Sequence, residues 1–217
     1  MPSRYSLDLA AIATKAVEQL SARNQARERA LAISREVVRL SANAIRAVHR
    51  AEFDEAGRLI AQATLRLKES ESMRRQNPEI YYAGFLADAR KEYSEANITL
   101  AVISGGEIPN PEDIGVGPPE FLNGMAEVIG ELRRYILDSL RRESFDRCNE
   151  YMDVMDEIYS ILVTVDFPEP VTGGLRHSTD QMRGVLERTR GDLTMALRQQ
   201  KLENRLANWE KQRPDSQ

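Results

Sequence analysis

Residues 31–50 read LAISREVVRLSANAIRAVHR, and their apolar side chains recur with the spacing of one face of an α-helix. Leu31, Val38 and Ile45 follow one another at intervals of seven residues, which corresponds to two helical turns. Further apolar residues lie beside this stripe at Val37, Ala44 and Val48. The segment therefore predicts a long amphipathic helix whose apolar stripe packs in a core or against another subunit.

The same helix extends well beyond this segment, because neither glycine nor proline occurs between Pro2 and Gly57. Ser6, with an acidic residue two positions later, is typical of a helix start. We expect one helix from there to about Arg50, with Ser21–Asn24 as its weakest point. Since a chain of 217 residues need not cover both faces of a helix about 60 Å long, the pattern also predicts an oligomer.

The rest of the chain also has helical periodicity and no convincing alternation of the kind that predicts strands. Glycine and proline divide it, most clearly at residues 105–119, which hold four of each and predict a loop. The helices that we expect after the first cover residues 52–73, 78–104, 120–141, 143–165 and 175–209. The fold class is therefore all-α, a single-domain bundle of about six or seven long helices over residues 1–210, with a frayed tail at 211–217.

Composition excludes several classes of function. The chain has 30 basic and 34 acidic residues, a net charge of −4, one cysteine and two histidines. An overall basic coat for nucleic acid, a disulfide framework, a multi-cysteine zinc site and histidine-based hydrolysis are therefore not expected. No apolar run approaches the roughly 20 residues that a membrane helix needs. We predict a cytoplasmic protein with no membrane partner.

Carboxylates remain as the candidates for chemistry. Glu92 and Glu95 are three residues apart on one predicted helix, and Glu127 and Glu131 are four apart on the next, so each pair shares a helix face. If the two helices pack side by side, four carboxylates meet among apolar neighbours, and a divalent cation would offset their charge. Mg²⁺ and Mn²⁺ prefer such oxygen ligands. From spacing alone, solvated faces or ion pairs with nearby arginines are the commoner explanation of such pairs.

Three stretches of the sequence carry a family resemblance. They are Tyr81-Tyr82, the Glu92–Ala96 block EYSEA, and EFLNGMAEVIGEL at Glu120–Leu132. With them the chain resembles the translin/Trax family over nearly its whole length, and it is most similar to the Trax-like single-gene members of archaea and bacteria. The resemblance implies a bundle of about seven helices that assembles into closed homo-oligomers, commonly octamers.

The resemblance also implies an activity and its residues. Trax is the catalytic partner of a metal-dependent endoribonuclease, and its catalytic positions correspond to Glu92, Glu95 and Glu127. The implied ligands of Mg²⁺ or Mn²⁺ are the same three residues and Glu131. Trax usually has Asp at the position of Glu127, so this chain carries one extra methylene there. Having both sets of carboxylates indicates the catalytic, Trax-like side of the family.

The expected substrate is single-stranded RNA, with single-stranded DNA as a second possible ligand, held by basic side chains that contact phosphates. The candidates are Arg66, Lys68, Arg74, Arg75, Arg90, Lys91 and Arg134. Arg176, Arg183 and Arg190 recur every seven residues on the last predicted helix and form a stripe for RNA or for a neighbouring subunit. Two alternatives stay open: a non-catalytic, translin-like single-strand-binding oligomer, and a structural scaffold whose glutamates pair with arginines.

Overall fold

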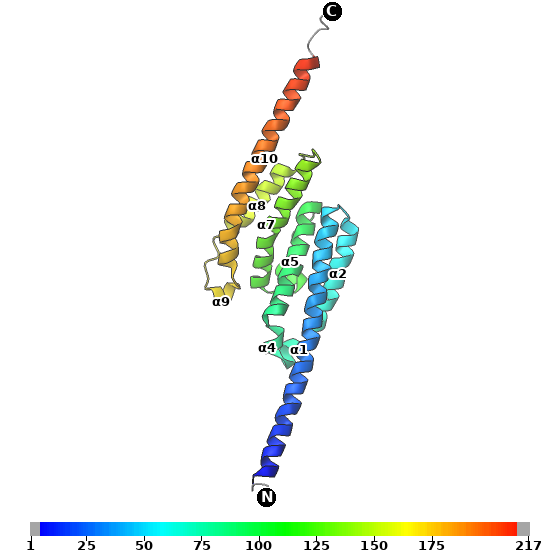
Figure 1. Cartoon of the computed structure of the whole chain (residues 1–217), viewed down its shortest axis with the longest axis vertical. Helices are drawn as coiled ribbons and strands as arrows, with labels where there is room; N and C mark the ends of the chain where they lie inside the picture. Colours follow the sequence, from blue (N-terminus) through cyan, green and yellow to red (C-terminus); the bar gives the residue numbers. More distant parts are fainter. Residues whose placement is uncertain (1–4, 212–217) are drawn as a thin grey trace, which may run out of the picture. The chain divides into compact units, whose positions relative to one another are not determined.

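The structure, a computed structural model, describes residues 5–211, and every regular element among them is a helix, as the sequence predicts (Figure 1). In chain order these are α1 (Ser6–His49), α2 (Phe53–Ser70), α3 (Met73–Gln76), α4 (Pro78–Tyr81), α5 (Gly84–Ser104), α6 (Pro111–Ile114), α7 (Pro118–Arg141), α8 (Cys148–Leu162), α9 (Glu169–Thr172) and α10 (Leu175–Lys211).

The chain divides into two compact units, one ending at Ala96 and the other beginning at Asn97, so the residues of α5 are shared between them. The single domain expected over residues 1–210 stays a prediction. Of the expected frayed tail, residues 212–217 lie outside the described residues, and Lys211 is the last residue of α10.

In the first unit, α1 is unbroken over its 44 residues, including the weak point expected near residues 21–24. Ala30, Val37 and Ala44 are completely buried and follow the predicted spacing of the apolar face. Helix α2 lies alongside α1 and buries Ile60 and Leu67 (Figure 1). The periodicity of the opening helix therefore predicted its length correctly and its buried face to within one residue, since Leu31 and Val38 of the predicted stripe are half-buried.

The helix expected over residues 78–104 is interrupted, and the prediction of one continuous helix there is wrong. Helix α4 ends at Tyr81 and α5 begins at Gly84. Both terminal nitrogens of the Arg90 guanidinium donate to the carbonyl oxygen of Tyr81, at 3.2 Å each. In a continuous helix this oxygen would accept the amide of Phe85. Arg90 thus satisfies the end of α4 and stabilises the turn. The helix expected over 52–73 is likewise divided, into α2 and the short α3.

In the second unit, helices α7, α8 and α10 pack against one another (Figure 1). The glycine- and proline-rich segment before α7 contains the short helix α6, which begins after Asn110. The backbone amide of Asn110 donates to the Asp113 carboxylate at 3.4 Å, as expected for a capped helix start. Asn123 of α7 donates to the carbonyl oxygen of Thr172 at 2.7 Å and so joins α9 to α7.

The helix expected over residues 143–165 begins later than predicted, at Cys148. Glu143 and Arg147 have φ values of 56° and 60°, a left-handed conformation that interrupts a helix. Arg147 donates to the carbonyl oxygen of Ile103 at 2.9 Å and that of Val102 at 3.3 Å, which are C=O groups in the last turn of α5, beyond the reach of the helix's own amides. These contacts, distant in sequence, hold the segment out of the helix.

Within residues 5–211, no helix combines the length and the apolar character that crossing a membrane would require.

Candidate functional site

Glu92 and Glu95 lie on α5, a helix that is buried around most of its circumference. Leu86, Tyr93 and Ile98 on this helix are at most 2% exposed, and the Tyr93 hydroxyl is 2.6 Å from that of Thr64 on α2. Glu95 is itself only 7% exposed, and Glu92 is partly exposed. A carboxylate buried among apolar side chains must be offset by a cation or by several donors, since its desolvation is costly.

Glu127 lies on α7, whose first residue is Pro118, a favourable residue at that position. Its neighbours Ala126, Val128 and Ile129 are at most 3% exposed, while Glu127 is partly exposed. Among the described residues, Glu92, Glu95 and Glu127 form a group in which one carboxylate oxygen from each lies within 4.8 Å of the other two. Glu131 is not part of this group; its Oε2 is 3.9 Å from Nη1 of Arg134.

The geometry of this carboxylate group fits a small hard cation. Two oxygens on opposite sides of a Mg²⁺ ion stand about 4.2 Å apart, twice the usual bond length, and adjacent ones are closer. A spacing of up to 4.8 Å is therefore within reach of a small side-chain rotation. The donor set contains only carboxylate oxygens, which suits Mg²⁺ or Mn²⁺ better than softer metals.

The basic residues predicted to contact RNA divide into three kinds. Arg90 is an internal group: it is 4% exposed, and its guanidinium lies 4.1 Å from the ring centroid of Tyr81, whose carbonyl oxygen it binds. The prediction that it contacts RNA at the surface is corrected, because its guanidinium is committed to the turn between α4 and α5.

The second kind consists of exposed or half-exposed cations that have a nearby carboxylate. Nη1 of Arg66 is 2.8 Å from Glu69, and Nζ of Lys91 is 3.8 Å from Glu92. Nη1 of Arg134 is 3.9 Å from Oε2 of Glu131. Ion pairs this exposed are weak, so a phosphate can compete for these cations.

The third kind consists of Lys68, Arg74 and Arg75, which lie exposed on α2 and α3. The neighbouring Tyr82 side chain raises the pKa of Arg74 above its usual range. Four of the predicted RNA contacts, Arg66, Lys68, Arg74 and Arg75, therefore lie exposed on α2 and α3.

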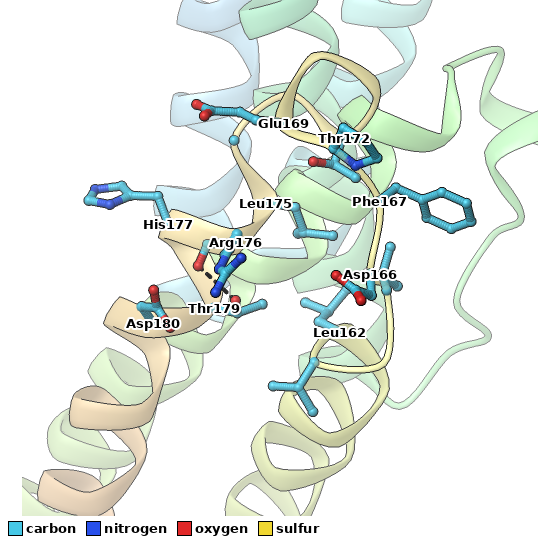
Figure 2. A pocket seen from close by; sticks show the side chains of 14 residues that line it. Leu162, Asp166, Phe167, Glu169, Thr172, Leu175, Arg176, His177, Thr179 and Asp180 are labelled. Carbon is cyan, nitrogen blue, oxygen red and sulfur yellow. Dashed lines mark hydrogen bonds between the residues drawn. The ribbon is translucent and has the colours of Figure 1, made fainter.

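The arginine stripe on the last helix consists mostly of ion pairs. Arg190 donates to both carboxylate oxygens of Asp156, at 2.5 and 2.6 Å, and Arg183 lies 3.4 Å from Glu187. Arg176 instead lines a cavity of about 1060 Å³ at the start of α10 (Figure 2).

The cavity is a feature that the sequence did not reveal. Buried Leu162 and Leu175 line it together with Asp166 and Asp180, and none of the carboxylates predicted to bind a metal lines it (Figure 2). The one sequence signal is Gly173-Gly174, whose φ values of 62° and 90° confirm that this pair makes the turn before the last helix.

Comparison with known proteins places this fold. No protein-family model matches the chain. An uncharacterised protein of Methanocaldococcus jannaschii is 28% identical over 192 residues, which are 88% of this chain and 85% of that protein. The structure of AfC3PO in complex with duplex RNA has a TM-score of 0.76 and 34% sequence identity, over 84% of this chain and 95% of that one.

A second AfC3PO structure gives the same TM-score at 33% identity, over 84% of this chain and 95% of that one. The structure of apo-NeC3PO also has a TM-score of 0.76, over 84% of this chain and 96% of that one, but its 17% identity supports the fold alone. The chain is thus an all-α protein with the helical fold of C3PO. It belongs to the translin/Trax family, which confirms the family predicted from the sequence.

Proposed function

We propose that this protein is a metal-dependent endoribonuclease of the Trax-like kind, which binds single-stranded RNA and hydrolyses its phosphodiester bonds. The group formed by Glu92, Glu95 and Glu127 is the observation that carries the proposal. These are the positions that correspond to the catalytic carboxylates of Trax. The alternative, that each glutamate belongs to a solvated face, is disfavoured by the burial of Glu95.

In this proposal Glu92, Glu95 and Glu127 hold one or two Mg²⁺ or Mn²⁺ ions, and Glu131 flanks them beside Arg134. When bound, the cation supplies Lewis-acid polarisation of the phosphate and a water molecule acidic enough to serve as the nucleophile. Glu95, fixed by burial on α5, anchors the ligand set. Glu92 and Glu127 are partly exposed and so can reach both the ion and the solvent from which water and RNA enter.

RNA binding itself is assigned to the exposed cations of the first unit. Arg66, Lys68, Arg74 and Arg75 contact phosphates and give binding that weakens with salt and has little sequence preference. The AfC3PO structure with duplex RNA supports RNA as the ligand class. We expect this protein to prefer single-stranded RNA, because the flexible backbone and unstacked bases of a single strand can adapt to a helical surface.

A homo-oligomer, with an octamer as the family resemblance implies, is also part of the proposal. Leu9, Ile12 and Leu20 on the first half of α1 are each more than 60% exposed. Leu202 and Trp209 near the end of α10 are at least 55% exposed. Apolar stripes of this extent at both ends of the chain are what subunit contacts would cover.

The test is cleavage of an end-labelled, single-stranded RNA with Mg²⁺ or Mn²⁺ present, or with EDTA. We expect the wild type to cleave only with metal, and the double variant Glu92→Gln, Glu95→Gln to lose cleavage while still binding RNA. Glu157→Gln serves as a matched control, because Glu157 is exposed on α8, outside the carboxylate group.

Circular dichroism of the double variant checks that it folds. A folded double variant that cleaves like the wild type would refute the assigned residues. A wild type that binds RNA and never cleaves it would refute the nuclease proposal and support the translin-like, non-catalytic alternative.

A further inference from the structure

One aromatic side chain of the first unit is exposed beside the basic residues that we assign to RNA binding. Tyr82 follows the last residue of α4, in the turn that leads to α5, and is 62% exposed. Large aromatic side chains usually bury most of their area, because each carries 150–250 Å² of surface. Tyr82 is therefore an unusually exposed aromatic side chain, at a turn that other residues hold in place.

The ring of Tyr82 is supported from behind by a fixed partner. It packs edge-to-face on Tyr81, with the ring centroids 4.9 Å apart and the planes at 90°. Tyr81 is held at its hydroxyl by the Glu71 carboxylate, at 2.6 Å, and over its ring by the buried Arg90. Because Tyr81 is anchored by these two groups, Tyr82 presents its ring with little freedom to lose on binding.

Basic side chains lie on the helix next to this turn. The Arg74 guanidinium lies 5.9 Å from the centroid of the Tyr81 ring, the ring on which Tyr82 packs. Arg75, the next residue, is exposed on α3. Helix α3 packs against α4. A rigid aromatic face beside two cations is the combination by which proteins hold a nucleobase and its adjoining phosphate.

We propose that Tyr82 stacks on an unpaired nucleobase of the bound RNA while Arg74 and Arg75 contact the neighbouring phosphates. The inference rests on the proposed RNA-binding function and adds the residue that selects single strands. In a duplex both faces of each internal base are already stacked, so the Tyr82 ring has no base to accept. The phosphates, in contrast, are available to the two arginines in either form.

The experiment is fluorescence anisotropy with two labelled probes, a 12-nucleotide single-stranded RNA and a blunt duplex of the same length, each titrated at several salt concentrations. Tyr82→Ala is expected to weaken binding of the single strand about tenfold, since one stacked base contributes about 1–3 kcal/mol. It should leave duplex binding and the salt dependence unchanged, and Tyr82→Phe should bind both probes like the wild type.

Two control variants separate stacking from charge and from general surface effects. Arg75→Gln should weaken binding of both probes and lower the slope of log K against log salt by about 0.7 for the single strand. Phe167→Ala removes an equally exposed aromatic ring, 63% exposed in the second unit, and should change neither affinity.

The outcomes distinguish this inference from the function on which it rests. If the wild type binds neither probe, the proposed RNA-binding function fails and the stacking role with it. If the wild type binds and Tyr82→Ala is unchanged, or loses single strand and duplex equally, the stacking role alone is refuted. A change in the size of the assembly on Tyr82→Ala, measured by size-exclusion chromatography with light scattering, would also refute it by assigning Tyr82 to a subunit contact.

Discussion

Arg147 offers the sharpest test of how the second unit is held together, and Arg147→Met is the change to make. This substitution keeps an apolar stem of similar length and removes the guanidinium. In the native protein the guanidinium donates to the carbonyl oxygens of Val102 and Ile103. It also donates to the two carboxylate oxygens of Glu150, at 2.8 Å each. It also lies 4.8 Å from the ring centroid of Tyr151.

The expected loss can be worked out from these contacts. Val102 and Ile103 are almost fully buried, so their carbonyl oxygens lose a charged donor that water replaces poorly, at a cost of about 1.5 kcal/mol or more. Loss of the cation–π contact with Tyr151 adds about 1 kcal/mol. The pair with Glu150 is more than half exposed on the carboxylate side and adds only a few tenths of a kcal/mol. We expect Arg147→Met to lower the free energy of unfolding by about 3 kcal/mol.

The assay is urea unfolding followed by far-ultraviolet circular dichroism. Arg147→Lys, which keeps the charge without the forked donor geometry, should lose an intermediate amount. Arg141→Met is the matched control, because Arg141 is 83% exposed and its ion pair within residues 5–211 is with Asp138 of its own helix. It should change stability by less than about 0.5 kcal/mol. A loss for Arg147→Met no larger than that of the control would refute the role we assign to Arg147.

Further predictions concern other buried groups of the second unit. Burial raises the pKa of Tyr151 to about 12; the folded protein therefore keeps this proton longer than the unfolded chain, and stability should fall from about pH 10 to about pH 12, less steeply in Tyr151→Phe. Asn123→Ala should lower the free energy of unfolding by about 2 kcal/mol, measured in urea, because the Thr172 carbonyl oxygen loses its donor; an unchanged midpoint would contradict this. Burial also raises the pKa of the Cys148 thiol, so a thiol reagent at neutral pH should react with the native protein far more slowly than with the urea-unfolded chain.

The long helices could be predicted from the sequence because their signal is local. The apolar side chains of residues 31–50 repeat with the helical period, and Val37, Ala44 and Val48 among them are fully buried on α1. The break between α4 and α5 and the late start of α8 could not be predicted from such a pattern. Each depends on a guanidinium that binds a carbonyl oxygen outside its own turn, Arg90 on Tyr81 and Arg147 on Ile103.

The candidate site shows the same division. Spacing put Glu92 and Glu95 on one helix face and Glu127 and Glu131 on another, but the family resemblance was needed to assign Glu92, Glu95 and Glu127 a shared catalytic role. Arg90 was predicted at the surface, although it follows Leu86 by four residues and so continues the buried face of α5. The spacing from Leu86 was the sequence signal that Arg90 is buried. The charged residues next to Arg90 in the sequence made this signal hard to recognise.

The most direct test of the central claim is anomalous diffraction from crystals of the wild type soaked in Mn²⁺. The account predicts one or two anomalous peaks bounded by carboxylate oxygens of Glu92, Glu95 and Glu127, at bond lengths near about 2.1–2.2 Å. Glu95→Gln crystals should lose or weaken those peaks. Density that shows the three carboxylates directed apart, or manganese bound elsewhere and never among them, would contradict it.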